Sequence, residues 1–309
     1  MNGRLAIGID IGHTNLRAGL VDQTGAVRDV IRERTDISGG PEGVLEQIVR
    51  SAELLRGKHE VAGIGVGIAG QCDIARGVVR CGPNLFWPDV PLQQWLNEEM
   101  KLPVILRNDV VMATVGEWRY GAGRGCHELV MLLVGTGIGG GAVVNGKLLQ
   151  GATGCGGHFG HISVQMDGPL CGCGRPGCVE AYASGSGLAT RAREDPCLSS
   201  SMLANTLRLD GMAVAQAALA GDPLALRLRD EAATALSSAV SNVINCFNPQ
   251  RVILGGAVLN GLTQLFDLTV RGAMEQCLPS HRDHLEMKNI ELGDLSGIIG
   301  AASWVHYPL

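Results

Sequence analysis

The stretch LAIGIDIGHTNLRAGLVD, residues 5–22, decides how this chain is expected to fold. Two apolar runs enclose a short turn that carries Gly12 and Thr14, and a second turn at 23–25 leads into a third apolar run. Apolar runs separated by glycine-containing turns are typical of antiparallel strands. Residues 5–35 are therefore predicted to form three strands joined by two tight turns.

The same plan recurs in the second half of the chain, in LVMLLVGTGIGGGAVVNGKLLQ, residues 129–150. The first turn of this segment carries Thr136 among glycines, and Asn145-Gly146 forms the second. Asn-Gly between apolar runs favours a two-residue hairpin turn, because both residues tolerate positive φ. The repetition predicts two halves that each open with a β-hairpin.

Each hairpin is followed by a pattern typical of alternating helices and strands. Residues 41–55 show helical periodicity, and the apolar strand 61–68 comes after them. In the second half a long helix is expected over 223–245, followed by a strand at 252–254. The sequence thus predicts a duplicated α/β architecture with a cleft between its two halves.

The two glycine turns are candidate phosphate-binding sites. Their backbone N–H groups, with the hydroxyls of Thr14 and Thr136, can donate hydrogen bonds to phosphate oxygens. A single turn of this kind is often only a tight connection, but two in corresponding positions, one beside Asp10, favour a nucleotide. The chain has no G-x4-G-K-[ST] motif, and no G-x-G-x-x-G spacing opens a clean helix.

A second chemical signal is GHFGH at 157–161, followed by CGCGRPGC at 171–178. One imidazole and three thiols lie within 18 positions: His161, Cys171, Cys173 and Cys178. This is the donor set of a closed tetrahedral zinc site, whose four protein ligands leave no position for a substrate. Buried free thiols are the alternative, but they have no reason to adopt C-x-C-x4-C spacing. A structural zinc is therefore predicted.

The composition favours a cytoplasmic globular protein. At 309 residues the chain is long enough for two domains, and its 45 glycines recur in clusters between apolar runs. A net charge of −5 disfavours a large non-specific nucleic-acid surface. Ten cysteines in a chain of this size do not suggest a small disulfide scaffold, and neither a signal peptide nor a membrane-spanning stretch is evident.

Together these motifs resemble those of the ROK family of sugar kinases and repressors, in the actin-like ATPase (hexokinase-type) superfamily. The similarity extends over essentially the whole chain. The matching positions are Asp10, Gly12 and Thr14 of a D-x-G-x-T phosphate loop, Gly135 to Gly140 of a second loop, Gly67 to Gly70 of a sugar-side G-x-x-G, the pair Pro83-Asn84, the catalytic pair Asn108-Asp109, the adenosine-side Gly255-Gly256, and the zinc segment from Cys171 to Glu180.

The resemblance implies duplicated α/β domains, a cleft between them and a structural zinc site. A smaller domain would span 1–117 and be completed by a C-terminal helix at 296–309. A larger domain, with the zinc site and a dimer surface, would span 118–295. The family usually dimerises through its larger domain, so a homodimer is expected.

The resemblance also implies a kinase that uses ATP and Mg²⁺ to phosphorylate the 6-hydroxyl of a hexose. Asp109 would take the hydroxyl proton; it follows an apolar run and starts a helical segment, where the alternative role is a helix N-cap, for which Asn108 and Asp109 are equally suited. The sugar would be held by Gly70, Asn84, Asn108, His158, His161 and Glu180. ATP and Mg²⁺ would be held by Asp10, Gly12, Thr14, Asn15, Gly135, Thr136, Gly137, Gly139, Gly255 and Gly256.

Two positions depart from the family pattern. His158 replaces the glutamate of the usual G-E-x-G-H segment, and a neutral imidazole offers one donor and one acceptor where a carboxylate only accepts. A histidine here resembles the bacterial N-acetylmannosamine kinases, whereas segments 83–92 and 116–123 look like bacterial glucokinases. A glucokinase is the first hypothesis and an N-acylhexosamine kinase the alternative. His13, where the first phosphate loop usually has glycine, is the second departure.

Hypotheses from two other classes stay open. The family includes sugar-sensing transcriptional regulators with an N-terminal helix-turn-helix, but the first strand is expected by Leu5, and the retained Asp109 favours catalysis. A zinc module for protein or nucleic-acid interaction would leave the duplicated phosphate turns unexplained. The sequence does not decide among glucose, mannose and N-acylhexosamines, and does not exclude polyphosphate as phosphate donor.

Overall fold

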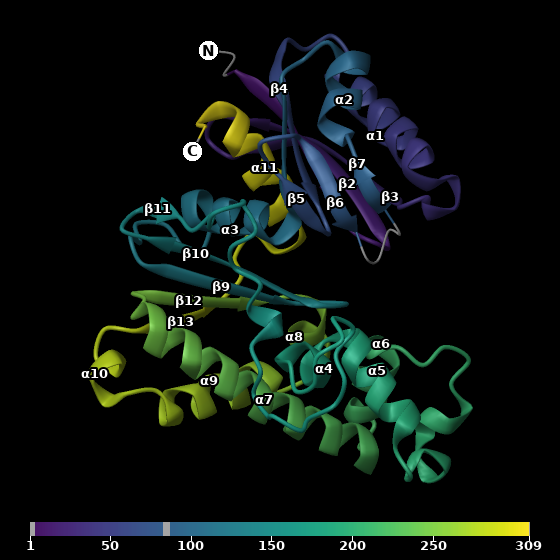
Figure 1. Cartoon of the computed structure of the whole chain (residues 1–309), viewed down its shortest axis with the longest axis vertical. Helices are drawn as coiled ribbons and strands as arrows, with labels where there is room; N and C mark the ends of the chain where they lie inside the picture. Colours follow the sequence, from purple (N-terminus) through teal and green to yellow (C-terminus); the bar gives the residue numbers. More distant parts are fainter. Residues whose placement is uncertain (1–3, 83–86, 309) are drawn as a thin grey trace. The chain divides into compact units, whose positions relative to one another are not determined.

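The computed structural model describes residues 4–82 and 87–308, and these form two units (Figure 1). Unit 1 comprises Met1–Gly125, Lys147–Gly157 and Glu291–Leu309, and unit 2 comprises Cys126–Gly146 and His158–Ile290. The assignment of functional domains to 1–117 with 296–309, and to 118–295, stays a prediction.

Ten strands form two five-stranded sheets. The first sheet contains β1 (Leu5–Ile11), β2 (Asn15–Asp22), β3 (Val27–Arg34), β4 (Val61–Ile68) and β8 (Val104–Asn108), and the second contains β9 (Leu129–Val134), β10 (Ile138–Val144), β11 (Lys147–Leu148), β12 (Arg251–Gly255) and β13 (Glu286–Asn289). A smaller sheet consists of β5 (Gln71–Asp73), β6 (Val78–Gly82) and β7 (Trp87–Val90).

The two large sheets share one topology. Their strand orders are β3-β2-β1-β4-β8 and β11-β10-β9-β12-β13. In each sheet the central strand, β1 or β9, is antiparallel to its hairpin partner and parallel to the next strand, β4 or β12. The duplicated α/β architecture predicted from the two hairpin segments is confirmed.

Helices follow the strands in both units. Unit 1 contains α1 (Gly40–Arg56), α2 (Leu92–Met100), α3 (Asp109–Tyr120) and α11 (Ser296–His306). Unit 2 contains α4 (Val179–Ala183), α5 (Gly185–Glu194), α6 (Gly211–Leu219), α7 (Pro223–Phe247), α8 (Ala257–Gly261), α9 (Leu265–Gln276) and α10 (Pro279–Arg282).

Local chemistry explains where several elements begin and end. Asn145 and Gly146 have φ values of 51° and 67°, as the predicted two-residue hairpin turn requires. Helix α7 begins after Asp222, whose carboxylate accepts a hydrogen bond from the N–H of Ala225. It ends at Phe247, and the residue that caps it, Asn248, is in the left-handed conformation just before a proline.

The first sheet lies between two layers of helices (Figure 1). Helices α1 and α2 cover one face, and α11 covers the other. Side chains along β1 alternate between these faces, so Ile7 packs with Val44 of α1 while Gly8 faces α11. A Cβ on Gly8 would lie 1.9 Å from the carbonyl oxygen of Ile298, so only glycine permits α11 to approach this closely.

Glu117 anchors the C-terminal end of α3. Its fully buried carboxylate accepts hydrogen bonds from the backbone N–H groups of Ala122 (2.8 Å), Leu292 (2.7 Å) and Glu291 (3.2 Å). Gly121 leaves the space for this carboxylate, since a Cβ there would lie 2.1 Å from Glu117 Oε2. The buried carboxylate of Glu117 therefore ties the segment 116–123 to itself and to the backbone at residues 291 and 292.

Replacing Glu117 with alanine is expected to lower the free energy of unfolding by about 3 kcal/mol, because three backbone N–H groups lose their acceptor at roughly 1 kcal/mol or more each. Urea unfolding of wild type and variant measures the difference. Glu117→Gln keeps one carbonyl oxygen and should lose less. An alanine variant as stable as wild type would show that water replaces the carboxylate at little cost.

Candidate functional site

Two carboxylates predicted to act in catalysis lie at the carboxyl ends of parallel strands in unit 1. Asp10 is the penultimate residue of β1, and Asp109 directly follows β8 as the first residue of α3. Strand β4 runs between them, with Gly67 aligned to Asp10 on one side and to Arg107 on the other. The carboxyl ends of parallel strands are the usual place for ligand sites in α/β sheets.

Asn108, and not Asp109, caps helix α3. Its Oδ1 accepts hydrogen bonds from the N–H groups of Val110 (3.0 Å) and Val111 (3.2 Å). Its Nδ2 donates to the carbonyl oxygen of Gly70 at 3.1 Å, which ties the predicted sugar-side glycine to the predicted catalytic pair. The sequence left the cap open between Asn108 and Asp109, and the structure assigns it to Asn108.

Both carboxyls have raised pKa values. Burial raises the pKa of Asp109 to about 6, although backbone hydrogen bonds at the start of α3 oppose the shift. Burial and the charge of Asp109 raise the pKa of Asp10 to about 7, against the attraction of Arg17, whose Nη1 lies 3.4 Å from Asp10 Oδ2. A carboxylate with a pKa near 6 is still mostly ionised at pH 7 and is a stronger base than an ordinary aspartate.

The chemistry around Asp10 fits a magnesium ion. Mg²⁺ prefers hard carboxylate oxygens, usually one or two from protein, with the remaining positions taken by water and phosphate oxygens. Burial is the main cause of the raised pKa of Asp10, the negative charge of Asp109 adds to it, and the nearby Arg17 offsets only part of the effect. A divalent cation would relieve the repulsion between the two carboxylates.

The first glycine turn is closed by backbone hydrogen bonds. The N–H of Gly12 donates to the carbonyl oxygen of Asn15 at 2.9 Å. Thr35, which was not predicted from the sequence, directly follows β3 and stabilises this turn: its hydroxyl donates to Gly12 O (2.7 Å) and its N–H to Thr14 O (3.1 Å). The carbonyl oxygens of Gly12 and Thr14 are therefore already hydrogen-bonded within the protein.

The second glycine turn, in unit 2, is held by the start of α5. The N–H of Gly185 donates to Gly135 O at 2.8 Å, and Ser186 donates to Thr136 O through both its N–H (3.1 Å) and its hydroxyl (2.8 Å). Ser186 was not predicted either. Its only sequence signal is the SGSG run at 184–187, which marks a helix start but does not name a partner 50 residues away.

Glu180 connects the Cys/His segment to this second turn. Its Oε2 accepts a hydrogen bond from the N–H of Ile138 at 2.7 Å, and its Oε1 lies 3.6 Å from Cys171 Sγ. Gly137 has no room for a side chain, because a Cβ would lie 2.7 Å from Glu180 Oε2. One carboxylate oxygen of Glu180, a predicted sugar ligand, is therefore hydrogen-bonded to the predicted phosphate loop, at Ile138.

The predicted zinc ligands come together in unit 2. The ligand atoms of His161, Cys171, Cys173 and Cys178 all lie within 4.8 Å of one another. Cys173 Sγ lies 3.7 Å from Cys178 Sγ, and Cys171 Sγ lies 3.7 Å from His161 Nδ1. Tetrahedral ligands at about 2.3 Å from zinc are about 3.8 Å apart, so these separations fit a four-coordinate ion.

The loop before this cluster is pressed against the second sheet. Phe159 packs edge-on against Phe247 at the end of α7, with ring centroids 5.7 Å apart, and a Cβ on Gly160 would lie 2.1 Å from Ile138 O. His158 and His161 flank Phe159 and Gly160 in the sequence, and the centroids of their rings are 6.3 Å apart. Burial, and then His161, lower the pKa of His158, so its imidazole is neutral at pH 7.

Gly256 and Gly139, two further predicted nucleotide ligands, lie beside strands of the second sheet or within them. Gly256 has a φ of 107°, and a Cβ on it would lie 2.4 Å from Val134 O, so glycine is required where β12 ends. Gly139 lies in β10, directly after the second turn. Asn84 lies outside the described residues.

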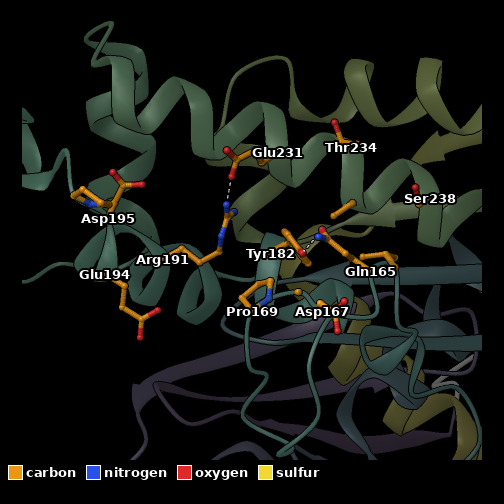
Figure 2. A pocket seen from close by; sticks show the side chains of 14 residues that line it. Gln165, Asp167, Pro169, Tyr182, Arg191, Glu194, Asp195, Glu231, Thr234 and Ser238 are labelled. Atoms are coloured by element: carbon orange, nitrogen blue, oxygen red, sulfur yellow. Dashed lines mark hydrogen bonds and ion pairs between the residues drawn. The ribbon is translucent and has the colours of Figure 1, made fainter.

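A cavity of about 560 Å³ in unit 2 lies apart from these predicted residues (Figure 2). It is lined by the segment 164–169 and by side chains of α4, α5 and α7. Figure 2 shows Arg191 directed at Glu231 and Tyr182 hydrogen-bonded to Gln165. None of the predicted sugar, ATP or metal ligands lines this cavity.

Comparisons with known proteins agree with the resemblance. The model of the ROK family matches residues 6–307. The glucokinase of Thermotoga maritima is 36% identical, with 96% of each chain covered, and the N-acetylmannosamine kinase of Escherichia fergusonii is 31% identical, also with 96% of each covered. The crystal structure of a ROK family glucokinase from Streptomyces griseus, in complex with glucose and AMPPNP, superposes with a TM-score of 0.83 at 33% identity, covering 96% of this chain and 98% of that one.

No helix within residues 4–82 and 87–308 is long and apolar enough to cross a membrane.

Proposed function

This chain belongs to the ROK family, and we propose that it is an ATP-dependent hexose kinase of the glucokinase type, which phosphorylates the 6-hydroxyl of glucose. The observation that carries the proposal is the position of Asp109, at the carboxyl end of β8 with a pKa raised to about 6. The similarity to a glucokinase solved with glucose and an ATP analogue supports it.

In this mechanism Asp109 accepts the proton of the sugar hydroxyl while the hydroxyl oxygen attacks the γ-phosphorus of ATP; the bond from that phosphorus to the β–γ bridging oxygen breaks, and ADP leaves. Asn108 holds the start of α3 and keeps the carboxylate at the strand end. The N–H groups of Gly12 and Gly135 are used within the two glycine turns, so the N–H groups of Thr14, Thr136 and Gly137 would be the ones that donate to phosphate oxygens. Asp10 would position Mg²⁺, which supplies charge neutralisation on the triphosphate when bound.

The Cys/His cluster would hold a structural zinc ion that braces the sugar side. Nδ1 of His161 faces the thiols, so Nε2 is left to donate to a sugar hydroxyl. Glu180, which lies beside Cys171 in the same segment of the chain, would also bind the sugar. In unit 1, the second N–H of the Asn108 amide, Gly70 and Asn84 would also bind the sugar.

N-acetylmannosamine is the alternative substrate, and His158 is the observation that favours it. A neutral imidazole can both donate to and accept from a sugar substituent, and the chain is also similar to an N-acetylmannosamine kinase. ADP release measured with each sugar separates the two: a higher kcat/KM with N-acetylmannosamine would replace glucose as the substrate. A homodimer formed through the predicted larger domain, 118–295, and a cytoplasmic location remain part of the proposal.

The raised pKa of Asp109 predicts the acid limb of the pH profile. Its protonated form cannot accept the hydroxyl proton, so kcat/KM for the sugar, which reports the pKa of the free enzyme, should be near its maximum above pH 7 and fall as the pH drops through about 6. Below that pH the decrease approaches about tenfold per pH unit. Initial rates at sugar concentrations well below KM, measured from pH 5 to 8, test it, and a kcat/KM that stays constant down to pH 5 would exclude a base with this pKa.

A further inference from the structure

The start of helix α11 leaves no room for a side chain beside Asp10. A Cβ on Gly297 would lie 2.9 Å from Asp10 Cγ and 3.1 Å from both its Cβ and Oδ2. Contacts below 3.0 Å are not made by real Cβ atoms, so a side chain at this position requires something to move. The two candidates are helix α11 and the Asp10 carboxylate.

Helix α11 cannot withdraw easily, because its backbone touches the sheet at two further glycines. A Cβ on Gly8 would lie 1.9 Å from Ile298 O, and one on Gly65 would lie 2.0 Å from Ala301 O. Interiors packed this densely have low compressibility and transmit strain, so the helix resists displacement from the sheet. The helix is seated on β1 and β4 next to Gly297.

Helix α11 is also locked against α3. A Cβ on Gly300 would lie 1.8 Å from Met112 O, and one on Gly116 would lie 2.3 Å from Ser296 O. Close backbone approach through glycines thus holds α11 on the sheet and on the helix that begins with Asp109. The Asp10 side chain, which rotates about its Cα–Cβ bond, is the part that yields.

The orientation of the Asp10 carboxylate is defined by its neighbours. Arg17 lies directly opposite it in the β1–β2 hairpin, with Nη1 3.4 Å from Asp10 Oδ2. The Nε of Arg17 is in turn 3.6 Å from Asp294 Oδ2, just before α11. The Asp10 carboxylate therefore lies between the guanidinium of Arg17 and the backbone of Gly297.

We propose that Gly297 is a positioning residue for Asp10: its missing side chain keeps the carboxylate in the orientation that serves the Mg²⁺·nucleotide. This inference rests on the proposed kinase function. It also gives a reason for glycine in the first turn of a helix, where glycine is otherwise less favourable than alanine.

Gly297→Ala is the test, with Gly43→Ala as matched control. Gly43 lies in α1 of the same unit, and the nearest atom to a Cβ there is Asp36 O at 3.9 Å, so alanine fits. Binding of Mn²⁺, as a paramagnetic stand-in for Mg²⁺, is titrated by electron paramagnetic resonance in the presence of ADP. Thermal unfolding of each protein is followed in parallel.

Gly297→Ala should weaken Mn²⁺ binding roughly tenfold, the lower end of the loss seen when the support of a metal site is removed. Its Tm should stay at or above that of wild type, and Gly43→Ala should bind Mn²⁺ as wild type does. In an Asp10→Ala background, Gly297→Ala should weaken binding no further, since the two changes act through one carboxylate.

Two results with the single variant would overturn the inference alone: wild-type Mn²⁺ binding by Gly297→Ala, or a large fall in its Tm, which would show that the helix moved instead of Asp10. Further weakening in the Asp10→Ala background would also overturn it, because the effect would then pass through another group. If the wild-type protein binds no Mn²⁺ with ADP, the proposed kinase function fails, and this inference fails with it.

Discussion

Asp109→Asn should lower kcat by about 10²- to 10⁴-fold, the range that a positioned general base contributes. Asparagine has nearly the same shape as aspartate but cannot take up the hydroxyl proton. The start of α3 should stay intact, because its cap is the side chain of Asn108. Steady-state kinetics with saturating sugar and Mg²⁺·ATP measure the loss, and an unchanged Tm shows that the fold is retained.

The neighbouring cap provides the matched control for this prediction. Asn108→Asp keeps an acceptor for the N–H groups of Val110 and Val111 but cannot donate to Gly70 O, so it should weaken sugar binding more than it lowers kcat. The two variants thereby separate proton transfer from positioning. Full activity in Asp109→Asn would mean that another group takes the proton.

If the Cys/His cluster holds the proposed zinc ion, Cys178→Ser should remove that ion and lower stability and sugar affinity together. Cys178 is fully buried, and its Sγ lies 3.7 Å from Cys173 Sγ, so a serine leaves the other ligands without a fourth partner. Loss of a structural metal belongs to the few changes that cost about 3 kcal/mol or more. For a domain of this size that lowers Tm by roughly 6–12 °C. Metal analysis, thermal unfolding and the sugar KM measure the three effects.

Cys277→Ser is the control for the loss of a buried thiol. Cys277 is also buried in unit 2 but does not belong to the Cys/His cluster. This variant should retain one zinc per chain and the wild-type sugar KM. A Cys178→Ser protein that retained zinc and bound sugar normally would show that the cluster is not a brace for the sugar side.

Features that depend on residues close in sequence could be predicted. The hairpin at Asn145-Gly146 follows from the φ values that these two residues tolerate. The Cys/His cluster could be predicted because its four residues lie within 18 positions and share a recognisable spacing. Helix α7 begins at the predicted Pro223 and ends two residues beyond the predicted Asn245, at Phe247.

Contacts between distant segments could not be predicted. Nothing in the periodicity of 116–123 shows that Glu117 accepts hydrogen bonds from residues 291 and 292, far along the chain. The choice of Asn108 over Asp109 as the cap depends on the backbone angles of one residue. Gly297 looks like an ordinary small residue until α11 is placed on β1, when it proves to lie against Asp10.

The central claim is that this chain transfers phosphate from ATP to a hexose. A coupled assay of ADP release, run with glucose, mannose, N-acetylmannosamine and no sugar, tests it most directly. Sugar-dependent ADP release, highest with glucose and yielding a product phosphorylated on its 6-oxygen, is the predicted result. No ADP release above the sugar-free rate with any of these hexoses, from protein that is folded and contains zinc, would contradict it.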